Sequence, residues 1–359
     1  MRGPRTSVAL LVAAVLAAGL RTSAQLVPPT ATFPLLESYL ESMRTQAGIP
    51  GMSAAVVRDE QIVWEKGFGF QNLESRLRAT PDTPYLVGDM TEMLAAVLLL
   101  QCVEQRRLDL DAPVRRYDLS QPEPDATPRG LLSHTTPPNA PVPFFYSPER
   151  YANLTSLVEW CVPQPFRKSV AHRVLRYLAM RDSVPGPDLA NRDLELPEGL
   201  FEAADLERYR TTLDRMAAPY KVDAKNRAER TEWPRMTISA SNGLVSTVRD
   251  LAQLDKALDG DGLLLEETRE MAWTPAVDRS GTLLPTGLGW FVQTYRNERL
   301  VWHFGYVPNA YSSLIVKVPS RQLTFILLAN SDGLSAQFDL ASGDVTRSPY
   351  ALLFLRLVK

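Results

Sequence analysis

The chain has 359 residues, of which 45% are hydrophobic and 22% charged, and this ordinary globular composition allows a large hydrophobic core. A formal net charge of −2 at pH 7 gives no electrostatic basis for binding nucleic acid or an anionic membrane surface, so we expect neither as a partner. The chain has no Cys-x-x-Cys, His-Glu-x-x-His or glycine-rich phosphate-binding motif, so we expect no metal and no cofactor.

The first 24 residues have the pattern of a signal peptide. Arg2 and Arg5 precede an apolar stretch over residues 8–20, and a small-x-small cleavage pattern ends at Ala24. This stretch is shorter than the ~20 residues that span a bilayer. We therefore expect cleavage after Ala24, no membrane span in the mature chain, and a periplasmic or secreted protein. An uncleaved N-terminal anchor is the alternative.

The next segments predict a surface helix and a β-hairpin. Apolar residues recur at helical spacing over residues 34–45, and residues 48–51 end that helix. Residues 52–57 and 61–70 have the character of strands, with a turn at Asp59 and Glu60 between them.

A central helix is predicted from Asp89 onwards, because residues 93–100 contain no polar side chain. Asp89 is a suitable N-cap, and Glu92 three residues later completes a capping box. Both carboxylates are also favourable at the positive end of the helix dipole. The favoured interpretation of this pair is therefore a helix start.

Residues 115–234 predict a mainly helical insertion. Residues 118–148 are rich in proline and lack periodicity, which is typical of a surface loop, and helical patterns return over residues 149–180. Cys102 and Cys161 both lie in apolar helical surroundings. Two unpaired buried thiols are the favoured interpretation, and a disulfide between them is the alternative.

The last third of the chain predicts strands between two helices. A helix capped by Ser246 or Thr247 is followed by strands over residues 287–294, 300–304, 311–318 and 322–328, and a last helix covers residues 350–358. Strands joined by short turns form antiparallel sheets.

The predicted fold class is therefore α/β (α+β), with a central antiparallel sheet flanked by helices. We expect residues 25–114 and 235–359 to form the sheet domain, and residues 115–234 to form the helical insertion.

Seven short segments in the expected order, over about 300 residues, resemble the serine beta-lactamase and penicillin-binding-protein-like hydrolases. The similarity is to the branch of class C beta-lactamases, D-alanyl-D-alanine carboxypeptidases and esterases, and it implies a beta-lactamase/transpeptidase-like fold. The segments are residues 48–59, 108–114, 131–135, 243–252, 287–290, 303–305 and 327–331.

The chemistry of that family rests on three motifs, and this chain keeps one of them intact. A Ser-x-x-Lys at the start of the central helix supplies the nucleophile and its base, but Asp89 and Glu92 stand at those positions. A Tyr-x-Asn is replaced by Tyr146-Ser-Pro148, so the tyrosine remains and the amide is lost. The Lys-or-His-x-Gly motif is present as His303-Phe-Gly305.

The resemblance assigns catalytic positions to Asp89, Glu92, Tyr146 and His303, the first two being substituted. It further implies that Pro148, Gly305 and Tyr306 line the binding site. The backbone amides of Asp89 and Tyr306 would form the oxyanion hole, the donor pair that stabilises the negative charge developing in acyl transfer.

Three functions follow as alternatives. The favoured hypothesis is an exported pseudoenzyme that has lost its nucleophile and base and binds a small-molecule or peptidoglycan-like ligand, or a partner. The second is an active hydrolase of ester, amide or peptide bonds, in which Asp89 or Glu92 activates water with Tyr146 or His303 as partner. The third is a structural protein whose pocket is filled by its own side chains. A metal site built from Asp89, Glu92 and His303 is a minor alternative for the carboxylate pair.

Overall fold

The structure is a computed structural model that describes residues 29–118, 120–137 and 140–358. The predicted signal peptide lies outside these described residues. Within the described part of the chain, no helix combines the length and the apolar character that crossing a bilayer requires.

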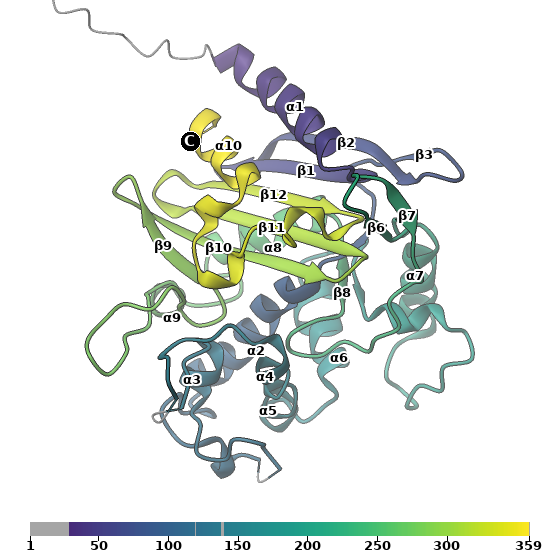
Figure 1. The fold of residues 1–359 in the computed structure, drawn as a ribbon. Coiled ribbons are helices and arrows are strands. Elements are labelled where there is room, and N and C mark those ends of the chain that lie inside the picture. Colours follow the sequence, from purple (N-terminus) through teal and green to yellow (C-terminus); the bar gives the residue numbers. More distant parts are fainter. Residues whose placement is uncertain (1–28, 119, 138–139, 359) are drawn as a thin grey trace, which may run out of the picture.

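A seven-stranded antiparallel sheet forms the centre of the molecule, with the strand order β3-β2-β1-β12-β11-β10-β9 (Figure 1). The N-terminal hairpin therefore joins the C-terminal strands through the pairing of β1 with β12, as the sequence predicts. The strands of this sheet are β1 Gly51–Arg58, β2 Gln61–Asn72, β3 Leu77–Arg78, β9 Phe291–Tyr295, β10 Glu298–Val307, β11 Tyr311–Val318 and β12 Leu323–Ala329.

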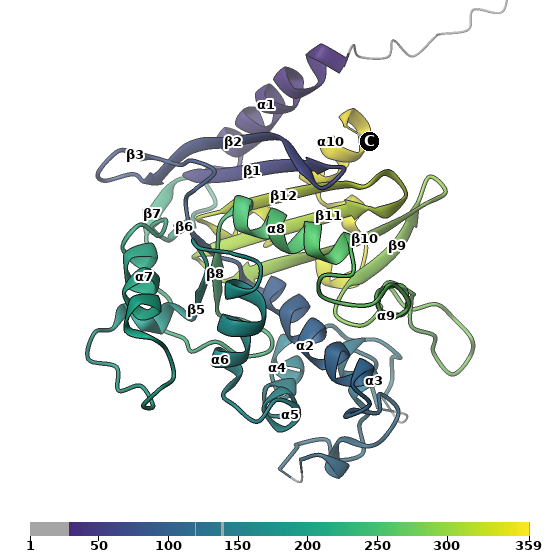
Figure 2. The ribbon, with the colours of Figure 1, turned by 180° about the vertical axis from the view of Figure 1, so that it is seen from behind.

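Helices cover both faces of this sheet. On one face, α1 (Pro29–Gln46) and α10 (Pro349–Leu357) pack on an apolar cluster that includes Leu40, Phe325 and Phe354 (Figure 1). On the other face lies α8 (Val248–Asp259), which begins at the predicted N-cap Thr247 (Figure 2). Coverage of both faces explains why nearly every residue of β1, β11 and β12 is buried.

The central helix α2 (Glu92–Glu104) lies in the larger of the two apolar clusters. Its residues 93–100 are each at most 1% exposed, which confirms that a helix apolar on all sides is buried on all sides. The predicted helix start is wrong, however. A 3₁₀ turn, η1 (Gly88–Thr91), precedes α2, and neither helix has a side-chain cap, so Asp89 and Glu92 do not form a capping box.

Two glycines allow η1 to approach β10 closely. A Cβ on Gly305 would lie 1.9 Å from the carbonyl oxygen of Val87, and a Cβ on Gly88, whose φ is +61°, would lie 2.8 Å from the backbone nitrogen of Tyr306. Only glycine, which has no Cβ, fits at these two close approaches, and it also adopts the positive φ of Gly88 without strain. The start of the central helix is therefore held against the end of β10.

One predicted strand starts later than expected. Residues 287–290 form a loop on the central helix instead of the first half of a strand, and β9 begins at Phe291. Gly289 has a φ of +87°, and a Cβ there would lie 2.3 Å from that of Ala96. The segment is apolar because it packs on α2. A short apolar run in the sequence does not distinguish such a buried loop from a strand.

The region 115–234 contains helices, irregular segments and short strands. Its division from the rest as a separate insertion stays a prediction. The helices of this region are α3 Pro128–Leu132, α4 Pro148–Tyr151, α5 Leu154–Cys161, α6 Phe166–Val170, the π-helix η3 Ala171–Arg176 and α7 Ala203–Asp214, and α9 Glu266–Ala272 follows later in the chain. The short strands are β5 Val184–Pro185, which joins β4 Tyr85–Leu86 and β8 Leu244–Ser246, and the pair β6 Tyr220–Val222 and β7 Ala228–Arg230.

Cys102 on α2 and Cys161 on α5 form a disulfide, with their Cα atoms 6.4 Å apart. The favoured prediction of two unpaired thiols is therefore wrong and the alternative is correct. Apolar helical surroundings predict burial of each cysteine, but the packing of α2 against α5 decides that the two meet.

Candidate functional site

The structure brings together the four predicted catalytic positions at the N-terminal end of α2. Asp89 on η1 and Glu92 on α2 face β10, where Glu92 Oε2 lies 3.2 Å from Nε2 of His303. The ring of Tyr146 lies 6.3 Å from that of His303. Pro148 begins α4, and its carbonyl accepts a hydrogen bond from the amide of Ala152, so its place in the binding site stays a prediction.

A second histidine, His134, belongs to the same cluster. Its Nε2 lies 3.1 Å from Oε2 of Glu92, and its ring is 4.6 Å from that of Tyr146. The sequence contains a signal for it, since His134 lies in a segment that resembles the family, but no function is predicted for it there. Glu92, His134 and His303 are all at most 3% exposed, so we call them the buried Glu–His–His cluster.

The hydrogen-bond partners define how this cluster is held together. Nδ1 of His303 lies 2.8 Å from the carbonyl oxygen of Phe304, and its Nε2 lies 3.2 Å from the Glu92 carboxylate. Nδ1 of His134 instead accepts from the backbone amide of Ser147 at 3.2 Å, so only its Nε2 donates to Glu92. The cluster therefore joins one carboxylate oxygen to two imidazole rings.

Glu92 is held in its ionised form by this arrangement. Burial raises the pKa of its carboxyl, but the charge and hydrogen-bond contributions of His134 and His303 together outweigh burial and place the pKa below its ordinary value. A carboxylate that accepts from two imidazoles is a poor general base, because a proton taken from water would weaken both contacts.

Asp89 has the opposite environment. Its Oδ2 accepts a hydrogen bond from the backbone amide of Tyr306 at 3.3 Å, and its Oδ1 lies 3.5 Å from Nδ2 of Asn242. Burial, and then the charge of Glu92, raise the pKa of this carboxyl well above its ordinary value, although the amides of Tyr306 and of Asp89 itself lower it. The two amides expected to form the oxyanion hole are thus directed at the carboxylate of Asp89.

Three buried polar atoms beside these residues have no hydrogen-bond partner among the described residues: Oε1 of Glu92, the hydroxyl of Tyr146 and Oδ1 of Asn242. Burial and the charges of Glu92 and Asp89 raise the pKa of Tyr146 well above its ordinary value, so this hydroxyl keeps its proton. A buried polar group without a partner is costly, and such groups often mark a place where water or a ligand binds.

The residues present do not form a metal centre. In the described ranges, no group of three or more His, Cys, Asp and Glu side chains is arranged to hold a metal ion, and this includes the combination of Asp89, Glu92 and His303.

Comparison with protein families gives one match over most of the chain. A family model described as beta-lactamase matches residues 36–344. The human serine beta-lactamase-like protein LACTB, mitochondrial, is 31% identical over 102 residues, which are 26% of this chain and 19% of that protein. The matched segment therefore spans about a fifth of the length of this curated relative.

Solved structures share the fold at lower identity. An octameric penicillin-binding protein homologue from Pyrococcus abyssi superposes with a TM-score of 0.71 at 23% identity, covering 90% of this chain and 77% of that one. A class C beta lactamase from Rhodobacter sphaeroides superposes with a TM-score of 0.63 at 17% identity, covering 83% of this chain and 94% of that one. The predicted fold class is thereby confirmed.

Proposed function

We propose a function for this chain, which belongs to the beta-lactamase family. It is a catalytically inactive, exported member of that family and binds a ligand through the site around Asp89. The match of the family model confirms the family resemblance seen in the sequence. That resemblance identifies positions 89 and 92 as those where the family has its nucleophile and its base. Neither a serine nor a lysine stands at positions 89 and 92.

The hydrogen bond from the amide of Tyr306 to the carboxylate of Asp89 carries this proposal. In acyl transfer, the donors of an oxyanion hole must be free to bind the oxygen on which negative charge develops. Here the side chain at the nucleophile position itself accepts from the amide of Tyr306, so this donor is not free to bind such an oxygen. The substitution therefore removes the nucleophile and also blocks the hole.

The base position is inactive for a different reason. Glu92 is ionised, but its Oε2 accepts from both histidines of the buried Glu–His–His cluster. In a related type of active site, loss of nucleophile and base together lowers the rate by ~10⁶-fold. We therefore expect binding to remain where turnover is lost.

The unpartnered atoms suggest the chemistry of the ligand. Oε1 of Glu92 and Oδ1 of Asn242 are acceptors, so the site favours a ligand that presents N–H or O–H groups. A small molecule or a peptidoglycan-like peptide with a free amine or amide has such groups.

Acylation by an activity-based probe tests the loss of catalysis. We expect a fluorescent penicillin and a fluorophosphonate to label less than about 1% of the purified protein under conditions that label an active serine hydrolase fully, since both groups that drive acylation are absent. Stoichiometric labelling would refute the proposal. Turnover of p-nitrophenyl acetate or nitrocefin that disappears in Asp89→Ala would instead support the water-based hydrolase.

A second candidate function is favoured by the burial of the site. The site is buried, with at most 5% exposure for each of Asp89, Glu92, His134 and His303. This is expected if the pocket that binds substrate in the family is filled here by the chain's own side chains and the fold serves as a scaffold. Nuclear magnetic resonance distinguishes the two candidates. Addition of D-alanyl-D-alanine should shift the Tyr306 amide signal if the site binds ligand, and a signal that stays unchanged favours the scaffold.

Export is part of the proposal. The disulfide between Cys102 and Cys161 supports it, because disulfides persist mainly in oxidising compartments outside the cytoplasm. We expect the mature protein from its native host to begin at Gln25, which N-terminal sequencing measures. A mature protein that retains residues 1–24 would instead support the uncleaved anchor.

A further inference from the structure

A cleft of about 570 Å³ lies at the opposite end of α2 from Asp89. With 13 residues, α2 separates the two places by about 20 Å. Arg106 and Arg107, which follow the end of α2, line this cleft together with Arg116, Tyr117 and Trp160. None of these residues contributes to the site around Asp89.

The cleft carries an excess of positive charge in a chain whose net charge is negative. Arg129 also lines it, but its guanidinium is paired with both carboxylate oxygens of Asp111, at 2.7 and 2.9 Å. Arg106, Arg107 and Arg116 are exposed and form no ion pair with any described residue.

The structural role of arginines at a helix C-terminus does not account for this group. The last carbonyl groups of α2 already accept backbone hydrogen bonds, such as that from the amide of Arg107 to the oxygen of Cys102 at 2.9 Å. No described hydrogen bond joins the side chains of Arg106 and Arg107 to these carbonyl groups. The guanidinium of Arg116 lies 5.9 Å from the centre of the Tyr117 ring, a contact that leaves its N–H donors available. Three guanidinium groups without an ion pair to a described residue can therefore bind an anion, and their forked donors suit carboxylate or phosphate.

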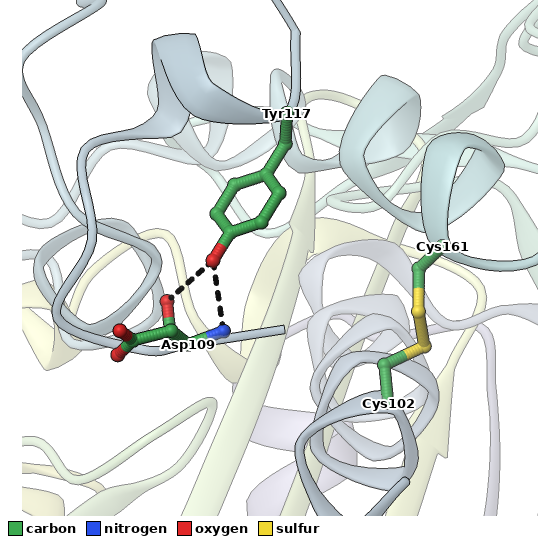
Figure 3. Close-up of a disulfide and its surroundings, with 4 residues drawn as sticks. All are labelled: Cys102, Asp109, Tyr117 and Cys161. Carbon is green, nitrogen blue, oxygen red and sulfur yellow. Dashed lines mark hydrogen bonds between the residues drawn. A yellow bond between two sulfur atoms is a disulfide. The ribbon is translucent and has the colours of Figure 1, made fainter. Parts of the chain in front are cut away.

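An aromatic pair forms another wall of the cleft. The rings of Tyr117 and Trp160 lie 4.8 Å apart at an interplanar angle of 59°. The hydroxyl of Tyr117 is fixed by hydrogen bonds with the backbone of Asp109, at 2.9 Å to its amide and 3.3 Å to its carbonyl oxygen (Figure 3). Trp160 remains 43% exposed, so it offers a ring face for a planar ligand to stack on.

The disulfide connects the two walls. Cys102 precedes Arg106 and Arg107 on one wall, and Cys161 directly follows Trp160 on the other. Figure 3 shows the bond between the two cysteines. The bond therefore fixes the spacing between the cationic side and the aromatic side. A site whose groups are already held in place loses less entropy when it binds.

We propose that this cleft, which we call the arginine cleft, binds a small organic anion that carries a flat ring. The carboxylate or phosphate group contacts Arg106, Arg107 and Arg116, and the ring lies against Trp160. Both head groups match the same guanidinium donors, so the experiment decides between them. Binding here requires neither catalysis nor a ligand in the site around Asp89.

Calorimetric titration of the oxidised chain tests this proposal with four probes: phenyl phosphate, benzoate, inorganic phosphate and benzyl alcohol. We expect phenyl phosphate or benzoate to bind at least about tenfold more tightly than inorganic phosphate and than benzyl alcohol, because only these two probes use both walls. The tighter of the two identifies the head group.

Variants locate the binding. The double variant Arg106→Gln with Arg107→Gln should lower the affinity for the preferred probe by about tenfold, the scale of one charge-assisted hydrogen bond. Trp160→Leu should make the preferred ring-bearing probe bind no more tightly than inorganic phosphate. Arg279→Gln is the matched control, because it removes an exposed arginine outside the cleft and should leave the affinity unchanged.

The circular dichroism spectrum and thermal midpoint of each variant establish that it is folded. Equal affinities for inorganic phosphate and for the tighter of the two ring-bearing anions would overturn the proposal. So would the absence of binding heat for both ring-bearing anions at millimolar concentration, or the same loss of affinity in Arg279→Gln as in the double variant.

Discussion

Replacement of Glu92 by glutamine is expected to lower the free energy of unfolding by about 3–5 kcal/mol at neutral pH, the scale of losing two hydrogen bonds to a buried charged group. Glu92 is fully buried, and its Oε2 accepts from Nε2 of both His134 and His303. A glutamine amide has one acceptor oxygen and one donor group without charge, so it would replace the carboxylate to which both histidines bind. Urea unfolding at pH 7 measures the difference.

The effect should depend on pH with a defined sign. The pKa of Glu92 in the folded protein lies below its ordinary value of 4.5, so its stabilising contribution is present above pH 4.5. That contribution is lost as the pH falls through the lowered folded pKa. The difference between the two proteins should therefore shrink under acid conditions, and a difference below about 1 kcal/mol at pH 7 would contradict the proposed role of the cluster.

Asp89→Asn is the matched control, because it neutralises a neighbouring buried carboxyl of opposite character. The folded pKa of Asp89 is raised well above 3.8, first by burial and then by Glu92, so its favourable contribution is lost as the pH rises through the raised value. The asparagine variant should be more stable than the native chain at pH 7, by about 1 kcal/mol. Its amide also offers a donor to the unpartnered Oδ1 of Asn242. Destabilisation of both variants would show that substitution alone, not charge, causes the effect.

Removal of the disulfide by Cys102→Ala with Cys161→Ala is expected to lower the free energy of unfolding by about 4 kcal/mol. The two cysteines are 59 residues apart, and closing a loop of that length restricts the unfolded chain by this amount in the chain-entropy estimate. The disulfide also ties α2 to α5 within the larger apolar cluster. Chemical denaturation at fixed pH measures the change.

A reducing agent provides the control for the disulfide. It should destabilise the native chain to about the level of the double variant and leave the double variant itself unchanged. The same response of both proteins to the reducing agent, or of neither, would show that the bond does not stabilise the fold. Reduction should also weaken binding in the arginine cleft, because Arg107 and Trp160 lie on different sides of the bond.

Most of the sheet could be predicted because its signals are local. The strand β11 has the bounds predicted for it, and the hairpin turn at Asp59 and Glu60 lies where two strand patterns meet. Two local predictions were wrong because tertiary packing decides these features. The segment 287–290 is apolar because it lies on α2, and the capping box at Asp89 and Glu92 is absent because both side chains face β10.

The site could be located from the sequence, but its chemistry could not. Motif positions place Asp89, Glu92, Tyr146 and His303 in one site, and the structure has them close together. His134 was missed because it belongs to none of the three motifs, and only the fold places its Nε2 beside Glu92.

The sequence by itself determined the fold class and the absence of a serine and a lysine where the family has its nucleophile and base, because both depend on residue identity and order. Only the tertiary structure decided that Asp89 and Glu92, three residues apart, have opposite environments. Asp89 accepts from the amide of Tyr306 and is driven towards protonation, whereas two histidines from distant segments keep Glu92 ionised. The protonation state of a buried carboxyl depends on which groups the fold places around it, and for Glu92 these groups are more than 40 residues away along the chain.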